Sequence, residues 1–309
     1  MSASAADEAP VNEPVALRRV RFVVAYDGAE FAGVAVNAGV TTVAGVLTEV
    51  LSRVTRREVR LSVAGRTDAG VHAWGQVVSC ELPASIDLDD LIRRVNQMCG
   101  PRVVIRTAAW AGDDFDARFS ALWREYRYTV VNAPVPNPFL ARTAWFVHRP
   151  LSLPALQLAC DPLIGENDFT SFCRRPSELA GTAEPSLHRR VMLARWTDVS
   201  AEMDGFTTDQ RVLRFEIRAN AFCQQMVRSI VGMMIDIGDG VRHAGDVRSI
   251  MAARDRRAAP RLAPAHGLML WEVGYPPGAD ADVHREANER SANPSQLDRG
   301  QGLRPKRLR

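Results

Sequence analysis

Two hydrophobic periods alternate along the first third of the chain and constrain its fold more than any other feature. Apolar residues occupy every second position in four segments, which predicts strands at 19–26, 59–64, 71–80 and 103–110. They recur with the helical period at 42–53 and 87–99, and Asp87 fits the N-cap of the second helix. The order β-α-β-β-α-β is that of a ferredoxin-like sandwich, whose antiparallel sheet leaves one face free for a ligand.

The remainder of the chain shows a similar mixture of elements. Alternating segments predict strands at 123–132, 144–148, 191–199, 212–219 and 268–273. Helical patterns cover 153–163, 221–237 and 246–254. We therefore expect two α+β domains, at 18–111 and 112–275, between a disordered leader (1–17) and a disordered, basic-ended tail (276–309).

Composition excludes several classes of protein. The apolar share of 46% and the charged share of 24% in 309 residues are normal for a globular protein. No apolar run approaches the roughly 20 residues that span a bilayer, so we expect no membrane partner. Five widely spaced cysteines without a Cys-x-x-Cys pair predict free thiols in a reducing cytoplasm and no metal site. A net charge of +3 does not by itself indicate a nucleic-acid partner.

The segment Gly65–Ala73, with the sequence Gly-Arg-Thr-Asp-Ala-Gly-Val-His-Ala, carries the strongest functional signal. It predicts a tight turn at 67–70 between two strands, with the Asp68 carboxylate two residues after Arg66. A nearby cation lowers a carboxylate pKa, and an ionised, poorly hydrated carboxylate is a nucleophile or a base. Aspartate before a small residue and glycine is also ordinary turn chemistry, and the residues alone favour that interpretation.

This motif resembles the signature of the tRNA pseudouridine synthases of the TruA family. Further blocks in the family's order extend the resemblance over most of the chain, from Tyr26 to Tyr275. They are Tyr26-Asp27-Gly28, Asp114–Ser120 with the following Arg124-x-Tyr126-Arg127-Tyr128, Gly165–Phe172, and Asn220-Ala221-Phe222 with Met226-Val227-Arg228. The resemblance implies an α+β fold of two ferredoxin-like halves, joined into one extended, mostly antiparallel sheet with a central cleft.

The resemblance also implies roles for four residues. Asp68 is the expected nucleophile, Arg228 its ion-pair partner, and Tyr126 the ring that stacks on the target base. The residues support these roles, because Tyr126 and Tyr128 share a strand face and an arginine in an apolar helix needs an anion. Arg66 is expected to reach a phosphate or the space that a flipped base vacates.

Other positions are given no chemistry. His72 is interpreted as a packed strand residue, and 165–172 as a helix-ending loop with two core phenylalanines. The chain departs from the family where Val34 and Ala35 replace the usual Trp and Gln, and at Gln224 and Gln225. These departures bear on how RNA is held and not on Asp68.

The expected activity is the isomerisation of uridine to pseudouridine in the anticodon stem-loop, at tRNA positions 38, 39 and 40. The expected partners are tRNA and a second copy of the chain, as a homodimer. No cofactor is expected, because the reaction involves neither redox change nor a group donor. The alternative is a non-catalytic RNA-binding or RNA-folding module on the same fold; a small-molecule enzyme with a carboxylate base is disfavoured by the length of the match.

Overall fold

The computed structural model describes residues 16–174, 186–203, 210–259 and 261–278. Its strands are β1 (Leu17–Tyr26), β2 (Ser62–Val63), β3 (His72–Pro83), β4 (Val103–Trp110), β5 (Trp123–Asn132), β6 (Trp145–Val147), β7 (Gly165–Asp168), β8 (His188–Asp198), β9 (Arg211–Ala219) and β10 (Leu268–Gly274). Its helices are α1 (Val43–Thr55), α2 (Leu88–Cys99), α3 (Leu153–Leu158), α4 (Met226–Gly238) and α5 (Asp246–Ala253). Short 3-10 turns are η1 (Gly28–Glu30), η2 (Asp161–Leu163), η3 (Thr170–Phe172), η4 (Ser200–Glu202), η5 (Arg256–Ala258) and η6 (Ala265–Gly267).

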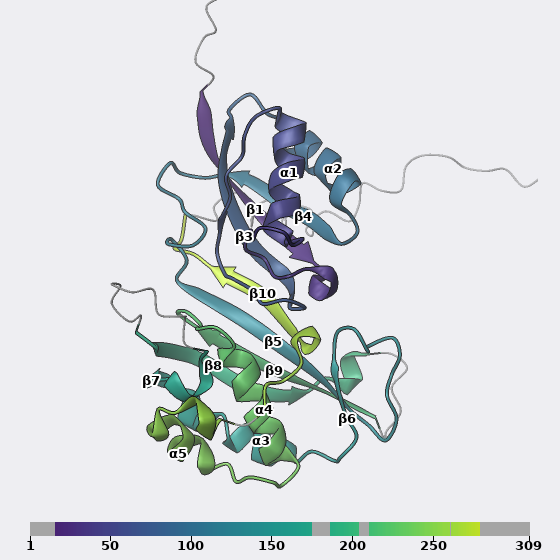
Figure 1. The fold of residues 1–309 in the computed structure, drawn as a ribbon, viewed down its shortest axis with the longest axis vertical. Coiled ribbons are helices and arrows are strands. Elements are labelled where there is room, and N and C mark those ends of the chain that lie inside the picture. The colour runs from purple at the N-terminus through teal and green to yellow at the C-terminus, as the bar shows by residue number, and fades with distance from the viewer. Residues whose placement is uncertain (1–15, 175–185, 204–209, 260, 279–309) are drawn as a thin grey trace, which may run out of the picture.

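All ten strands belong to one sheet with the order β4-β1-β3-β10-β5-β9-β8-β7, while β2 pairs with β3 and β6 with β5. Only β10–β3 and β5–β6 are parallel among these pairs. The expected α+β fold with one extended, mostly antiparallel sheet is therefore confirmed. Figure 1 shows α1 and α2 beside the first strands, and α3, α4 and α5 beside β7, β8 and β9.

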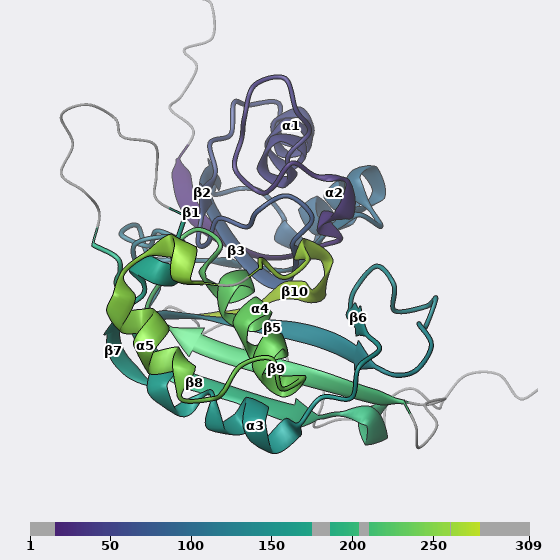
Figure 2. The ribbon, with the colours of Figure 1, turned by 60° about the horizontal axis from the view of Figure 1, so that its bottom comes forward.

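The last strand joins the two halves. β10 lies between β3 and β5, so the end of the described chain completes the middle of the sheet (Figures 1 and 2). Its parallel register pairs Met269 with His72 and Leu270 with Ala73. Its antiparallel register pairs Leu270 with Tyr126. The segment after Asp68 and the strand of Tyr126 are thus separated by one strand.

Local sequence accounts for several boundaries. The Asp87 side chain accepts from the backbone N–H groups of Asp89 and Asp90, which confirms the predicted N-cap of α2. Thr42 caps α1 by accepting from the Gly45 N–H at 3.2 Å. Phe169 and Phe172 are fully buried, as predicted, because they pack in the core of the second half. The 165–168 part of that segment is strand β7 and not loop.

Two predicted elements begin at other residues in the structure than the sequence pattern indicated. The helix predicted from residue 221 begins at Met226, because Gln225 adopts a left-handed φ of 66° that a helix cannot continue through. The predicted tight turn is a broad loop, since β2 ends at Val63 and β3 begins at His72. Within this loop the turn spans 68–71 and not 67–70, with Val71 N–H donating to the Asp68 carbonyl and Gly70 at φ +78°. The first residues of β3 pair with β10, so β2 does not extend beside them.

The cysteines correct another prediction. Cys173 and Cys223 form a disulfide with Cα atoms 5.7 Å apart, so five free thiols were the wrong expectation. The bond joins the end of η3 to the segment before α4, which the Arg174 N–H to Gln224 carbonyl hydrogen bond also connects. The two cysteines are 50 residues apart in the chain, so no local sequence pattern indicated this contact. Cys80, Cys99 and Cys160 are free and buried.

The chain ends are described only in part. β1 begins at Leu17, one residue inside the predicted leader, and the leader before residue 16 lies outside the described residues. The tail predicted at 276–309 is described as far as Gly278. Among the described helices, none has the length and apolar character needed to cross a bilayer.

We expect Gly232→Ala to destabilise the fold, although alanine normally favours a helix interior. A Cβ at Gly232 in α4 would lie 1.9 Å from the Arg261 carbonyl oxygen, so the two backbones would have to separate. The expected loss is about 2 kcal/mol in the free energy of unfolding, measured by urea denaturation. Gly245→Ala is the control, because a Cβ there meets nothing within 4 Å. Equal stability of the two variants would contradict this packing.

Candidate functional site

The loop 64–71, which we call the Asp68 loop, lies between the two groups of helices. On one side the Val34 N–H, just before α1, donates to the Thr67 carbonyl at 3.2 Å. On the other, Arg228 of α4 approaches the Asp68 carboxylate. The loop therefore lies on the helix-bearing side of the sheet. The opposite face of the sheet is the free face on which the sandwich pattern predicted a ligand.

Hydrogen bonds fix the backbone of the Asp68 loop. The Gln76 side chain donates to the Gly65 carbonyl at 2.8 Å and accepts from the Gly65 N–H at 3.2 Å. The Tyr26 hydroxyl and the Thr67 hydroxyl lie 2.7 Å apart. Complete burial raises the pKa of Tyr26 to about 12, so this phenol stays protonated at neutral pH. These contacts hold the residues just before Asp68 in one conformation.

Arg124 bonds four backbone carbonyls around the site. Its Nε and Nη2 donate to the Ala64 carbonyl at 3.2 and 2.8 Å, directly before the Asp68 loop motif begins. Nη2 also donates to the Arg118 carbonyl, and Nη1 donates to the carbonyls of Ala121 and Asn220. Burial lowers the pKa of Arg124 from its ordinary value. Arg124 belongs to the same sequence motif as Tyr126, two residues before it and on the same strand face. The motif predicted no role for this arginine.

Asp68 and Arg228 lie together. Arg228 Nη1 is 3.6 Å from Asp68 Oδ2, and the two side chains are 15% and 28% exposed. Arg228 Nε donates to the Ala263 carbonyl at 2.8 Å, while the Ala263 N–H donates to the Arg228 carbonyl. The guanidinium is thus fixed from behind and presents Nη1 to the carboxylate. The Asp68 carboxylate therefore has a fixed cation beside it.

Tyr126 lies under the same loop. Its ring is 7% exposed and meets the Phe222 ring edge-on, with centroids 5.0 Å apart. Its hydroxyl is 3.6 Å from the position that a Cβ on Gly65 would occupy. Burial raises the pKa of Tyr126, and the nearby Asp68 carboxylate adds to that effect. The ring is therefore a neutral, largely apolar surface close to the carboxylate.

The other residues that the sequence singled out differ in their surroundings. Arg66 is on the Asp68 loop, and its side chain is exposed. His72 is 3% exposed, accepts from the Gly28 N–H at Nδ1, and contacts the Arg142 carbonyl at Nε2, as expected of a packed residue. Val34, in place of the family's usual Trp, is 1% exposed and belongs to the core. Ala35 is half-buried.

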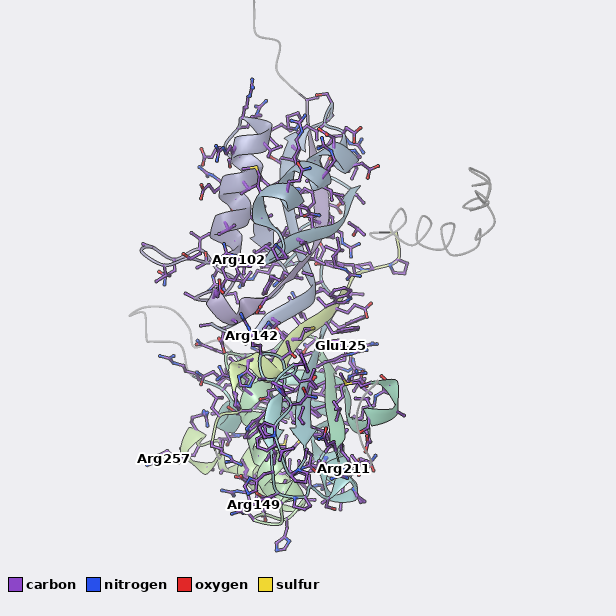
Figure 3. All side chains as sticks on the ribbon, turned by 90° about the vertical axis from the view of Figure 1, so that its right-hand side faces the viewer. Arg102, Glu125, Arg142, Arg149, Arg211 and Arg257 are labelled. Carbon is purple, nitrogen blue, oxygen red and sulfur yellow. A yellow bond between two sulfur atoms is a disulfide. The ribbon has the colours of Figure 1, made fainter. Side chains whose placement is uncertain are left out.

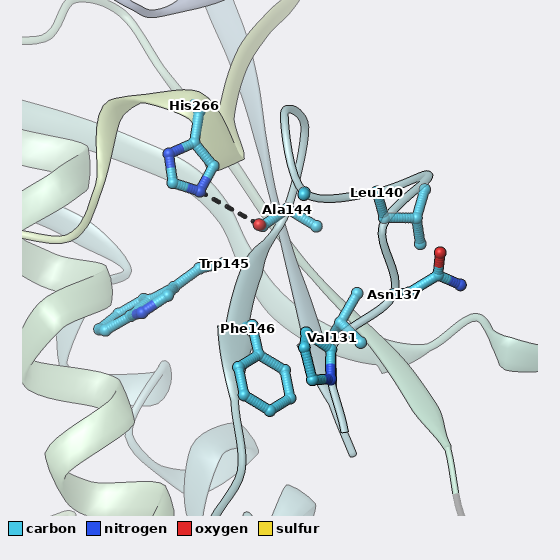
Figure 4. Close-up of a pocket in the computed structure, with 9 residues that line it drawn as sticks. Val131, Asn137, Leu140, Ala144, Trp145, Phe146 and His266 are labelled. Atoms are coloured by element: carbon cyan, nitrogen blue, oxygen red, sulfur yellow. Dashed lines mark hydrogen bonds between the residues drawn. The ribbon is translucent and has the colours of Figure 1, made fainter. Parts of the chain in front are cut away.

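Asp68 lines neither of two hollows in the described part of the chain. One, of about 230 Å³, lies beside β6, where His266 Nε2 contacts the Ala144 carbonyl at 3.1 Å (Figure 4). The other, of about 460 Å³, lies beside α5. The expected central cleft is neither of these. Among the described residues no group of three His, Cys, Asp or Glu side chains is placed to hold a metal ion.

Comparison with known proteins agrees with the sequence motifs. Residues 159–276 match a family model described as tRNA pseudouridine synthase. The chain is 38% identical over 259 residues to the tRNA pseudouridine synthase A of Brevibacillus brevis, covering 84% of this chain and 100% of that protein. It is 39% identical over 274 residues to the protein of the same name from Frankia casuarinae, covering 87% and 94%. The Geobacillus kaustophilus protein of that name is 38% identical, covering 84% and 95%.

Arg124→Lys is expected to loosen the Asp68 loop without unfolding the sheet. A lysine keeps the charge but lacks the planar fork that reaches several carbonyls at once. Amide hydrogen exchange in peptides covering 64–71 and 218–224 should become faster, while exchange in α2 stays unchanged. Arg94→Lys, at an exposed arginine of α2 that pairs with Asp90, is the control. Unchanged exchange at 64–71 would show that Arg124 does not hold this loop.

Proposed function

Because the chain belongs to the tRNA pseudouridine synthase A family, we propose that it isomerises uridine to pseudouridine in the anticodon stem-loop of tRNA. The proposed target positions are 38, 39 and 40 of the tRNA, and Asp68 is the proposed nucleophile. The observation that carries this proposal is the Asp68 carboxylate, which lies 3.6 Å from the largely buried side chain of Arg228.

The reaction needs only a nucleophile and a site that retains the detached base. An Asp68 oxygen attacks the target nucleoside, either at C1′ of the ribose or at the uracil ring. The bond between N1 and C1′ breaks, the uracil turns, and C5 bonds to C1′. The bond to the Asp68 oxygen breaks as the product forms or leaves, which regenerates the carboxylate. The proton on C5 is released and N1 gains one, so the product is an isomer of the substrate. No electron acceptor or group donor enters this balance, which is why no cofactor is proposed.

The surrounding residues support this chemistry. Arg228 places a cation beside the Asp68 carboxylate, and its hydrogen bond to the Ala263 carbonyl holds the guanidinium in place. Tyr126 offers a neutral ring on which a uracil can stack, and Phe222 restrains that ring. Arg66 is exposed on the same loop, within reach of a phosphate or of the gap left by a flipped base.

Asp68→Asn is expected to abolish turnover, because the amide keeps the shape of the side chain but is not a nucleophile. The measurement is release of tritium from tRNA labelled at uracil C5, in which wild type should release label from the anticodon stem-loop. Asp90→Asn, at an exposed carboxylate of α2, is the matched control and should retain activity. Normal release by Asp68→Asn would reject the nucleophile. A wild type that binds tRNA but releases no tritium would support a non-catalytic RNA-binding module instead.

We also propose that the active form is a homodimer and that the helix-free face of the sheet forms its interface. This face carries Trp74 and Trp271, whose ring centroids are 6.2 Å apart, and Trp74 is 43% exposed. The Arg127 guanidinium lies 3.8 Å from the Trp271 ring and 3.1 Å from Glu216. Glu125 is buried on the same face beneath these side chains, near β10 in Figure 3.

The charge on this face favours protein over RNA as the partner. Glu125 accepts from Arg218 at 2.6 Å, and Glu216 accepts from Arg195 at 2.6 Å. Arginines that are already paired and stacked on tryptophan offer little free charge to phosphates. Aromatic residues and arginine are enriched at protein interfaces.

Trp74→Glu is expected to convert the dimer to a monomer, because it places an unpaired charge at the centre of the proposed interface. Sedimentation velocity at micromolar concentration measures the mass directly. Leu158→Glu, at a 60% exposed leucine on α3, should leave the dimer intact. A wild-type monomer, or a dimer that survives Trp74→Glu, would reject this interface.

A further inference from the structure

The turn 116–120 displays an aromatic ring beside the Asp68 loop. Phe119 is 80% exposed, and the Arg118 guanidinium lies 5.1 Å from the centre of its ring. We propose that Phe119 and Arg118 form a stacking site for an unpaired base of the tRNA substrate, outside the site of the target uridine. This inference rests on tRNA being the substrate, as proposed above.

The turn is rigid, so the exposure of Phe119 does not come from a loose loop. Asp116 Oδ1 accepts from the backbone N–H groups of Arg118 and Phe119 at 2.8 and 2.9 Å. The Asp116 N–H donates to the Ser120 hydroxyl, and the Ser120 N–H donates to the Asp116 carbonyl. Burial acts to raise the pKa of Asp116, but hydrogen bonds from Phe119, Ser62 and Arg118 outweigh it and lower the pKa. The carboxylate that holds the turn therefore stays ionised at neutral pH.

Hydrogen bonds of Ala117 attach the turn 116–120 to the sheet and to Tyr275. Ala117 is fully buried, its N–H donates to the Ser79 hydroxyl at 3.0 Å, and its carbonyl accepts from the Tyr275 hydroxyl at 2.7 Å. Two residues later the chain exposes a phenyl ring to water. A fixed backbone that presents an apolar ring to solvent is suited to a flat apolar ligand, because little ordering entropy is lost on binding.

Arg124 connects this turn to the Asp68 loop. Its Nη2 donates to the Arg118 carbonyl and to the Ala64 carbonyl, at 2.8 Å in both cases. The turn and the Asp68 loop are therefore bridged by one nitrogen atom. A nucleotide near the target uridine in the RNA strand can reach Phe119 while the uridine is at Asp68.

The side-chain chemistry fits an RNA base. Every base has a π-face, so a phenyl ring stacks on any of them without selecting a sequence. An arginine beside the ring adds a cation–π contact and a charge for the adjacent phosphate. Arg118 is exposed, and its guanidinium remains available on the side away from the ring.

The first test separates binding from chemistry in steady-state tritium release from labelled tRNA. Phe119→Ala should raise KM about tenfold, the loss expected when one stacked base is released, and leave kcat within twofold. Phe119→Tyr should behave as wild type, because it keeps the ring. Leu158→Ala removes a comparably exposed apolar side chain from α3 and should change neither constant. An unchanged KM in Phe119→Ala, or failure of tyrosine to restore it, would overturn the proposal.

A second test identifies the occupant. A photoreactive benzoylphenylalanine at position 119 should cross-link to one unpaired nucleotide of tRNA in the wild-type background. Arg118→Gln should reduce the slope of log Kd against log salt by about one unit, as expected for one lost phosphate contact. Cross-linking to a second protein chain, with a lower sedimenting mass in Phe119→Ala, would assign the ring to a dimer contact and overturn the RNA site. Failure of wild type to release tritium would reject the proposed function separately.

Discussion

The ion pair between Asp68 and Arg228 connects the two halves of the molecule, and the geometry of the site depends on it. Asp68 follows a strand of the first half, whereas Arg228 lies in a helix of the second half among fully buried neighbours such as Ile230. A charge in such surroundings is costly unless it is paired. The pairing therefore fixes α4 relative to the Asp68 loop, and the Ala263 backbone holds the guanidinium from its other side.

The middle of the sheet makes that pairing possible. β10 lies between β3 and β5, so the strand that follows the Asp68 loop and the strand that carries Tyr126 have a fixed offset. Leu270 pairs with Ala73 on one side and with Tyr126 on the other. Asp68, Arg228 and Tyr126 thus come from segments far apart in sequence. A loop that side chains of both halves hold in place loses little conformational freedom when substrate binds. This favours attack from a defined position.

Local sequence predicted the parts that depend on local physics. The strands at 103–110 and 123–132 have the predicted bounds, and Asp87 caps α2 as expected, because alternation and capping are short-range signals. The predicted start of α4 was wrong, because Gln225 adopts a left-handed φ that the apolar periodicity does not reveal. The turn in the Asp68 loop was predicted one residue too early, because β10 and not β2 pairs with the start of β3.

Periodicity and contiguous motifs were enough to predict the α+β class, the family and Asp68, Tyr126 and Arg228 as candidate residues, because these signals lie along the chain. Tertiary packing was needed to show that Arg124 bonds the backbone at both Ala64 and Asn220, that Cys173 meets Cys223, and which side of the sheet carries the candidate site. Each of these depends on residues tens of positions apart. Such contacts have no local signature, because packing and register bring the residues together only once the sheet has formed.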